Sequence, residues 1–410
     1  MTARLTTLLC AALALAGVGI VATPQTALAQ QQDAKTVNPK MGPPLQAALT
    51  AAKNKQYDVA LAKIKEAEAE KKTPYEQFKI NETLAFIYAG QKRYADLAAI
   101  YEKMVDSQFV DKSRINAQIV AQTYSHAQQH AKVIEYSKRW LQDNPNDAAA
   151  LHMLGQAYYL TRDSKSCKDT MSAAISNAEK SGSRTPENWL ALLRSCAAAL
   201  GDNATANQVL DKLVRSYGKP EYWQTYIRNN SNNATDIAAF HWARLMNEVG
   251  VLKEADDYSN YAQQAMLVYG SPAEALRVVE DGFKKKILGA DAKSKARHEI
   301  LLTKTKEAAQ TDKAQWSQMA AAADQDATGE KSAAMGMAYF GAQQYDQAIN
   351  YLDKAVKKGS LKETAHVRLT LGEAQLAKNQ RDAARANFKA AESDAALGKV
   401  AAAWMIRSYN

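Results

Sequence analysis

Residues 151–175 read LHMLGQAYYLTRDSKSCKDTMSAAI, and this stretch carries the pattern that decides the fold. Its apolar residues recur three and four positions apart, which predicts helices rather than strands. Leu154 and Gly155 are adjacent, and Tyr158 follows one helical turn later. On a helix, a small residue flanked by large ones lets a second helix approach closely. The stretch therefore predicts a tightly packed pair of helices.

The same large–small–aromatic triplet recurs along the chain. Three of its tyrosines, Tyr88, Tyr124 and Tyr158, lie 36 and then 34 residues apart. Further triplets are Leu84, Ala85 and Tyr88; Val120, Ala121 and Tyr124; Met335, Gly336 and Tyr339; and the opening pair Leu371 and Gly372. Small residues also recur on the second helix of each unit, at Ala60, Ala348 and Ala384. A fixed period of this length predicts an all-α fold of stacked helix pairs.

These repeats resemble the tetratricopeptide repeat (TPR), a helix–turn–helix unit of about 34 residues. The resemblance is good over 41–180 and 329–395, partial over 186–228, where Trp189 and Trp223 take the early large position, and poor over 229–328. It implies a right-handed α–α superhelix of antiparallel helix pairs, that is, a TPR-like solenoid whose first helices line a concave face.

The N-terminal residues have the three parts of a secretory signal peptide. Arg4 is the only charge before an apolar run that ends near Ala22, and Ala27-Leu28-Ala29 precedes Gln30. We expect cleavage after residue 29 and a periplasmic location; an uncleaved membrane anchor is the alternative. No second apolar run approaches the length that spans a bilayer.

The remaining chain divides by pattern. Residues 30–44 lack periodicity and are predicted to be a flexible tether. TPR-like repeats are expected over 45–228, degenerate helical repeats over 229–328, and TPR repeats with a capping helix around Trp404 over 329–410. The loop at 228–236 is interpreted either as a hinge between two solenoid halves or as a long turn between helices.

Two cysteines remain after the signal peptide, Cys167 and Cys196. In repeat register Cys167 takes the position of Ala348 and Ala384, a buried contact between helices. Cys196 falls on the first helix of the next unit. An even pair in an exported chain suggests a disulfide between them. Two buried free thiols are the alternative.

The sequence has no motif typical of catalysis or of cofactor binding. HExxH, GxSxG and a glycine-rich phosphate loop are missing from it, and its carboxylates are scattered. His126 and His130 have metal-ligand spacing but no acidic third ligand nearby. The formal charge of +9 is mild and dispersed, which disfavours nucleic-acid binding. We expect no enzyme activity, no metal and no cofactor.

What remains is a surface for a protein or peptide partner. The predicted concave face is amide-rich and neutral to basic, as suits an extended or helical peptide; ordinary solvent-facing residues are the alternative interpretation. The predicted partner-binding residues are Gln118, Gln122, His126, His152, Gln156, Tyr159, Arg194, Gln224 and Arg228.

A narrower resemblance lies in the helix starts. Pro186-Glu187-Asn188-Trp189 and Pro220-Glu221-Tyr222-Trp223 are similar to segments of exported TPR proteins associated with TonB energy-transduction systems of Gram-negative bacteria. This resemblance implies a non-catalytic periplasmic scaffold, an accessory component of a TonB-type complex. Two other hypotheses stay open: an envelope-biogenesis adaptor, in polysaccharide export or outer-membrane assembly, and a solute- or glycan-binding solenoid. The oligomeric state is not predicted.

Overall fold

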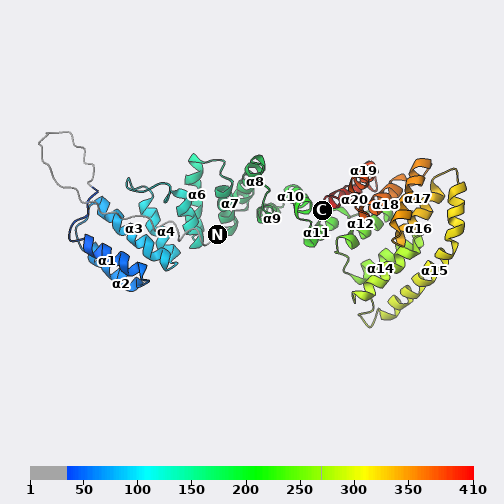
Figure 1. The fold of residues 1–410 in the computed structure, drawn as a ribbon, viewed down its shortest axis with the longest axis horizontal. Coiled ribbons are helices and arrows are strands. Elements are labelled where there is room, and N and C mark those ends of the chain that lie inside the picture. Colours follow the sequence, from blue (N-terminus) through cyan, green and yellow to red (C-terminus); the bar gives the residue numbers. More distant parts are fainter. Residues whose placement is uncertain (1–34, 269) are drawn as a thin grey trace. The chain divides into compact units, whose positions relative to one another are not determined.

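The computed structural model of the chain describes residues 35–268 and 270–410. Over these residues it contains 20 α-helices, one π-helix and no strand (Figure 1). Consecutive helices pair antiparallel through short turns, so the predicted all-α solenoid of helix pairs is confirmed. The predicted signal peptide, residues 1–29, lies outside the described residues.

Contacts divide the chain into two units, residues 1–206 and 207–410. The division falls within α10 (Asn203–Tyr217). The loop that follows Arg228 lies inside the second unit, where it joins α11 (Pro220–Asn230) to α12 (Asp236–Glu248). Thr235 ends this loop and caps α12, because its hydroxyl oxygen accepts from the backbone N–H of Ala238. The loop is therefore a turn between two helices of one unit.

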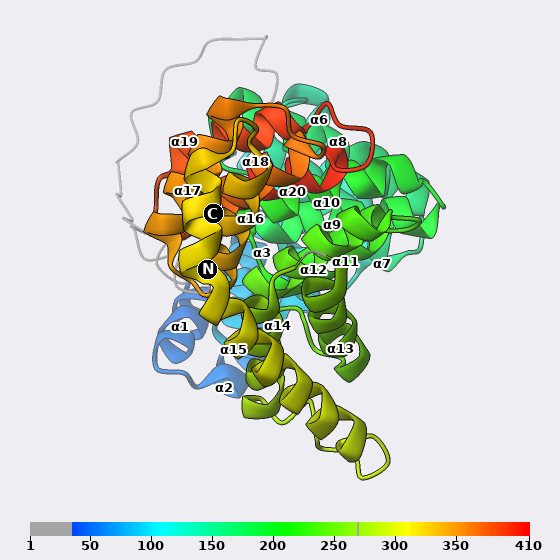
Figure 2. The same cartoon turned by 90° about the vertical axis from the view of Figure 1, so that its right-hand side faces the viewer.

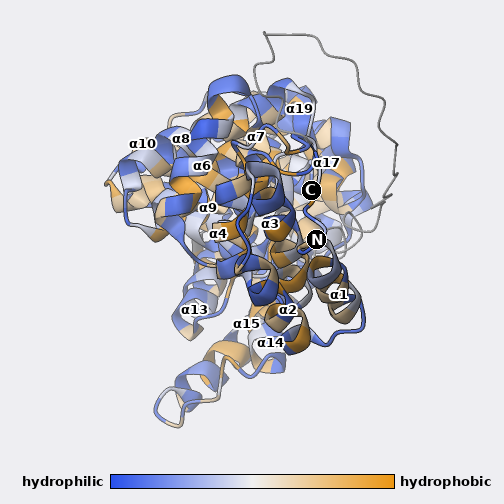
Figure 3. Ribbon diagram, turned by 90° about the vertical axis from the view of Figure 1, so that its left-hand side faces the viewer, coloured by the Kyte–Doolittle hydropathy of each residue, from blue (hydrophilic) through white to orange (hydrophobic). Residues whose placement is uncertain are grey.

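Unit 1 is a stack of helix pairs, most of which pack around a shared core. Figure 3 shows hydrophobic residues next to hydrophilic ones on many of these helices, as expected of helices that bury one face. A single buried cluster runs from Met41 to Ala157. The helices of the stack that precede α10 are α1 (Gly42–Lys53), α2 (Tyr57–Glu68), α3 (Pro74–Gly90), α4 (Tyr94–Met104), α5 (Ala117–His126), α6 (His130–Asp143), α7 (Ala148–Leu160), α8 (Ser164–Lys180) and α9 (Glu187–Ala199).

The turn inside each pair repeats as closely as the helices do. One residue in the turn takes a left-handed conformation, with φ between 57° and 64°. The next backbone N–H then bonds back to the carbonyl five residues earlier, as Arg93 does to Tyr88 at 2.9 Å. These positions are Lys55, Lys92, Gln128, Arg162, Gln343 and Asn379. The backbone alone thus reproduces the repeat that the side-chain triplets predict.

The small residue of the triplet marks the closest approach of the two helices. A Cβ added at Gly155 would lie 2.6 Å from the sulfur of Met171. At Gly372 it would lie 2.5 Å and 2.8 Å from two ring carbons of Phe388. These distances are shorter than van der Waals contact, so an added methyl group would force the side chain of Met171 or Phe388 to shift.

Alanine at these two glycines should therefore have different costs. Gly372→Ala drives a methyl group into a buried ring, which should destabilise the chain by about 1–3 kcal/mol, partly offset by up to about 1 kcal/mol of helix propensity. Gly155→Ala meets the Sδ and Cγ atoms of Met171, whose unbranched side chain can change rotamer, and should cost less than Gly372→Ala. Urea denaturation followed by circular dichroism measures both. A larger loss at Gly155 than at Gly372 would contradict this account.

Unit 2 continues the helix pairs but closes on itself. It contains the longest described helix, α15, which forms a hairpin with α14 (Figure 2). Besides α11 and α12, its elements are α13 (Ala255–Gln263), the π-helix η1 (Gln264–Val268), α14 (Pro272–Lys284), α15 (Lys295–Gln325), α16 (Glu330–Gly341), α17 (Tyr345–Lys358), α18 (Thr364–Ala377), α19 (Arg381–Ala391) and α20 (Gly398–Arg407).

Closure brings the last helices of unit 2 onto its first ones. Trp404 of α20 shares one buried cluster with Trp223 of α11 and Trp242 of α12. The last residue adds a hydrogen bond to this contact, because the side-chain amide of Asn410 donates to the carbonyl of Val214 at 2.9 Å. Residues 398–407 form the expected terminal helix with Trp404 buried. That helix covers the beginning of its own unit as well as the end.

The start of the first helix differs from the sequence expectation. The predicted tether extends to residue 44, whereas α1 begins at Gly42. Pro43 and Pro44 fit the first turn of a helix, where no backbone N–H is needed. Met41 is fully buried, and the backbone N–H of Asn38 donates to a carboxylate oxygen of Glu76 at 2.7 Å. Residues 38–44 are therefore part of the folded unit.

Across the described ranges, no helix is both long enough and apolar enough to cross a bilayer.

Candidate functional site

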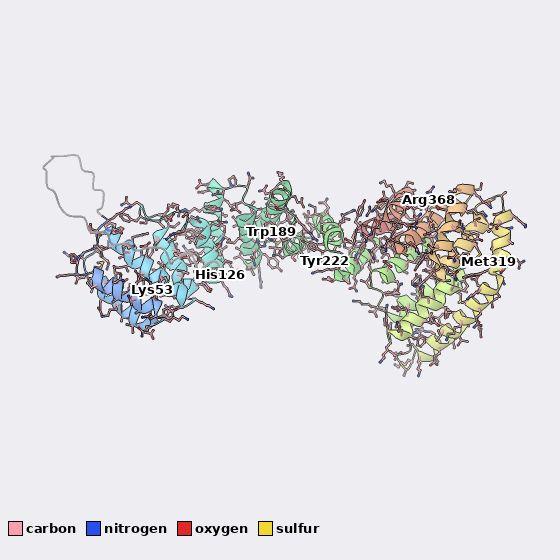
Figure 4. All side chains as sticks on the ribbon, viewed as in Figure 1. Lys53, His126, Trp189, Tyr222, Met319 and Arg368 are labelled. Carbon is pink, nitrogen blue, oxygen red and sulfur yellow. A yellow bond between two sulfur atoms is a disulfide. The ribbon has the colours of Figure 1, made fainter. Side chains whose placement is uncertain are left out.

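The candidate site is the surface that α5, α7 and α9 form in unit 1. These are the first helices of three successive pairs, and each contacts the next. Figure 4 labels His126 at the end of α5 and Trp189 at the start of α9. Seven of the nine predicted partner-binding residues lie on these helices: Gln118, Gln122, His126, His152, Gln156, Tyr159 and Arg194.

Asp147 joins α5 to α7. Its Oδ1 accepts from the backbone N–H groups of Ala149 and Ala150, both at 3.0 Å, which caps α7. Its Oδ2 accepts from the side-chain amide of Gln118 at 3.1 Å and from the indole N–H of Trp140 at 2.9 Å. Gln118 therefore has a structural bond that positions the two helices and is not simply a free amide.

His152 and Trp189 join α7 to α9. Their rings stack with centroids 4.7 Å apart and planes only 8° from parallel. Burial lowers the pKa of His152, so its ring is neutral at neutral pH. Trp189 was recognised in the sequence as a repeat position, but its place in the site was missed because the stacking partner lies on another helix.

The C-terminal ends of α7 and α9 expose large apolar side chains. Tyr159 is 45% exposed, Leu160 49% and Leu200 43%. Gln156 is exposed one turn before Tyr159, on the same face of α7. We call Tyr159, Leu160 and Leu200 the α7–α9 edge. Beside the amide of Gln156, it offers apolar contact and hydrogen bonding to a polypeptide.

The other predicted residues are placed differently. The exposed ring of His126 stacks on Tyr94 of α4 at 5.0 Å, which turns it toward the preceding pair. Gln122 and Arg194 are half-buried. Gln224 and Arg228 are exposed on α11, in unit 2. The structure thus assembles the predicted surface over unit 1 only.

Behind this surface, Cys167 of α8 and Cys196 of α9 form a disulfide with Cα atoms 6.0 Å apart. Both are fully buried. The bond ties the second helix of one pair to the first helix of the next.

The part of the chain that the structure describes has no group of three or more His, Cys, Asp or Glu side chains placed to hold a metal ion. His126 ends α5 and His130 begins α6, so the two histidines lie on either side of a turn.

A second polar assembly, absent from the sequence expectations, lies buried in unit 2. The guanidinium of Arg244 donates to both carboxylate oxygens of Glu274, at 2.7 Å and 2.8 Å. Its Nη1 donates to Glu373 and to the hydroxyl of Thr370, both at 2.9 Å. The phenol of Tyr261 donates to Glu274 at 2.6 Å. One arginine thus connects α12, α14 and α18.

The same assembly extends into a chain of titratable groups. Glu373 Oε1 lies 2.8 Å from His241 Nδ1, and His241 Nε2 lies 2.8 Å from His366 Nδ1. Burial lowers the pKa of both histidines. Burial raises the pKa of Glu373 to about 8, although Arg244 opposes the shift. At pH 7 this chain is therefore mostly neutral, with Glu373 protonated and donating to His241.

Burial alone would raise the pKa of Glu274 as well, but the attraction of Arg244 for its carboxylate is the larger effect. The bidentate ion pair lowers the pKa of Glu274 to about 2, so this carboxylate is ionised. The only sequence signal for the assembly is spacing: His241 and Arg244 are three apart, and Thr370 and Glu373 are three apart, each pair on one helical face.

Comparison with known proteins gives no family. No family model matches the chain, and no curated protein matches it. A tetratricopeptide repeat protein from Parabacteroides merdae is 11% identical, with 91% of this chain and 100% of that chain covered and a TM-score of 0.31. A chain of the Naa15/Naa10 complex bound to HypK-THB is 14% identical, with 86% of this chain and 63% of that chain covered and a TM-score of 0.34. The P58(IPK) TPR domain is 9% identical, with 90% of this chain and 97% of that chain covered and a TM-score of 0.23. Because these scores are low, the fold rests on the helix pairs of this chain.

Proposed function

We propose that this chain is an exported, non-catalytic scaffold that binds another protein in the bacterial cell envelope through unit 1. The observation that carries the proposal is the α7–α9 edge, where three large apolar side chains are exposed at the C-terminal ends of two helices that contact each other. Large apolar groups grouped on a surface are typical of protein contacts, especially with hydrogen-bonding groups around them.

The surface is also preorganised. The Gln118–Asp147 bond and the His152–Trp189 stack hold α5, α7 and α9 in register before any partner binds. The disulfide behind them ties α8 to α9. A rigid surface loses little entropy on binding, so a small number of contacts suffices for useful affinity.

The narrower proposal is an accessory role in a TonB-type system. It rests on the sequence resemblance of residues 186–189 and 220–223. Trp189 takes part in the stack described above, and Trp223 is buried in the core of unit 2. Both tryptophans thus have structural roles, which leaves the resemblance itself as the support for this choice of partner.

The experiment compares variants of the α7–α9 edge with a matched apolar control. The double variant Leu160→Ser, Leu200→Ser should lose partner binding by roughly tenfold or more, because buried apolar anchors dominate interfaces. Val59 of α2 is equally exposed, at 50%, and Val59→Ser should bind like the wild type. The readout is quantitative capture from a periplasmic extract by the chain beginning at Gln30, with partners identified by mass spectrometry.

The identity of the captured proteins separates the hypotheses. TonB-system proteins would support the narrower proposal, while polysaccharide-export or outer-membrane-assembly proteins would support the envelope-biogenesis alternative. Equal capture by all three chains, or specific partners only in cytoplasmic extracts, would contradict the scaffold proposal.

A further inference from the structure

Unit 2 contains a cavity of about 140 Å³ beside the buried polar assembly. Side chains from α12, α13, α14, α16, α17, α18 and α20 line it, so it exists only because the unit closes on itself. Arg244 and Glu373 form part of its polar wall, and Phe340, Leu376 and Trp404 form an apolar wall.

Arg277 of α14 is the unusual group in this cavity. Within residues 35–268 and 270–410 its guanidinium has neither a hydrogen bond nor an ion pair, and its Nε is buried without a partner. Arg244, on the facing helix, has two carboxylates and a hydroxyl. A partly buried guanidinium without a hydrogen-bonded anion is costly, since its charge is only partly hydrated.

The charges around the cavity leave one positive charge uncompensated near pH 7. Arg244 and Arg277 are cations, and Glu274 is the ionised carboxylate that faces them. Glu373 is mostly protonated, because burial raises its pKa to about 8. Glu248, which also lines the cavity, pairs with Arg407 at 2.8 Å and contributes no net charge.

We propose that this cavity binds a small monocarboxylate with an apolar body, whose carboxylate pairs with Arg277. The guanidinium fork fits a carboxylate through two parallel hydrogen bonds. One uncompensated charge matches a monoanion, whereas a phosphate dianion would leave excess negative charge next to Glu274. The side chains of Phe340, Leu376 and Trp404 suit the apolar part of such a ligand.

The ligand can be a free organic acid or the C-terminal carboxylate of a peptide, because both present the same group. This site lies wholly in unit 2 and is independent of the α7–α9 edge. Failure of one proposal therefore leaves the other intact.

The test uses the chain from Gln30 to Asn410 with five probes: isovalerate, benzoate, inorganic phosphate, and the tripeptide Gly-Gly-Leu as free acid and as C-terminal amide. Isothermal titration calorimetry and thermal unfolding measure binding. Isovalerate or benzoate should bind saturably at millimolar concentration or below and raise Tm. Phosphate and the amidated peptide should not. Binding of the free-acid peptide in preference to both small acids would identify a chain end as the natural ligand.

Arg277→Gln is the decisive variant. It breaks no hydrogen bond or ion pair with the described residues and loses only the longer-range attraction of Arg277 to Glu274. It should therefore fold with a Tm near that of the wild type and lose carboxylate affinity by roughly tenfold or more. Arg277→Lys should retain part of the affinity, since it keeps the charge but not the fork. Arg368 is likewise half-buried in unit 2 and bonds to Asn387 at 3.2 Å; Arg368→Gln should bind like the wild type. No saturable binding of any carboxylate, or equal binding by Arg277→Gln, overturns the proposal, and so does phosphate binding as tightly as the acids.

Discussion

Glu274→Gln should destabilise unit 2 by about 3–5 kcal/mol at pH 7, the cost of leaving a buried charge without its partner. The same substitution at Glu373 should leave unit 2 equally stable or more stable. Both side chains are buried and both accept from Arg244. Their opposite responses follow from their protonation states.

Glu274 is an ionised carboxylate that balances Arg244 through two hydrogen bonds. A neutral amide offers one oxygen and no charge, so Arg244 is left with a buried positive charge. Glu373 is already neutral at pH 7. Glutamine reproduces its protonated form, because the amide N–H₂ donates to His241 Nδ1 while the amide oxygen accepts from Arg244.

The pH dependence of the two variants should also be opposite. The folded pKa of Glu373, about 8, lies above its ordinary value, so its contribution to stability is present at acidic pH and is lost as pH rises from about 4.5 to 8. The free energy of unfolding of Glu373→Gln should therefore increase relative to that of the wild type as pH rises through this range. The folded pKa of Glu274, about 2, is depressed, so its contribution is present above about pH 4.5 and is lost as pH falls toward 2. The destabilisation that Glu274→Gln causes should therefore become smaller as pH falls below about 4.5.

Hydrogen exchange measured by mass spectrometry on peptides from α12 and α18 follows unit 2 directly. Urea denaturation at pH 5, 7 and 8 gives the free energies. At pH 7 and 8 both buried rings stay neutral in the wild type, because burial holds the pKa values of His241 and His366 well below the ordinary range, so the comparison rests on these two pH values. Equal destabilisation by the two substitutions would show that Glu373 is ionised as well and would refute the assignment.

Reduction of the disulfide should lower the stability of unit 1 by about 3–4 kcal/mol, the loop-entropy value for cysteines separated by 29 residues. Cys167 and Cys196 lie on neighbouring helices of a stack in which each pair contacts only its neighbours. The loss should therefore be confined to α8, α9 and the helices against them, with little change in total helix content.

A double alanine variant provides the control. Alanine occupies the position of Cys167 in later repeats, at the fully buried Ala348 and Ala384, so packing there is preserved. Cys167→Ala with Cys196→Ala should match the reduced protein apart from a modest cavity cost at Cys196. Thiol labelling of the native protein, unfolded without reduction, should detect no free thiol. Two labelled thiols per chain would show that the cysteines are packed but unbonded.

The sequence by itself determined the helices and the contacts between neighbours. The triplet at Leu154, Gly155 and Tyr158 predicts both a helix and its closest approach to the next one, because both depend on residues within one repeat. The register that places Cys167 at a buried alanine position needs only the period. Proline at residues 74, 220 and 272 begins α3, α11 and α14, since helix starts depend on local backbone geometry.

The tertiary structure alone decided which polar residues are engaged. The sequence places Gln118 and Gln156 alike on the first helix of a repeat. Gln156 is exposed, whereas Gln118 bonds to Asp147, which caps another helix. His152 stacks on Trp189, and no spacing in the sequence joins them. Side-chain partners on different helices depend on rotation and translation between helices, which an apolar periodicity does not specify.

The closure of unit 2 is the strongest case. Arg244 and Glu373 are 129 residues apart and come into contact only after η1, the 31-residue α15 and four further helices. The weakly repetitive region between them carries no fixed register. Each turn and each irregular helix adds its own rotation, and these rotations accumulate along the chain. The cavity, the uncompensated Arg277 and the protonated Glu373 arise from that accumulated geometry, which only the folded chain reveals.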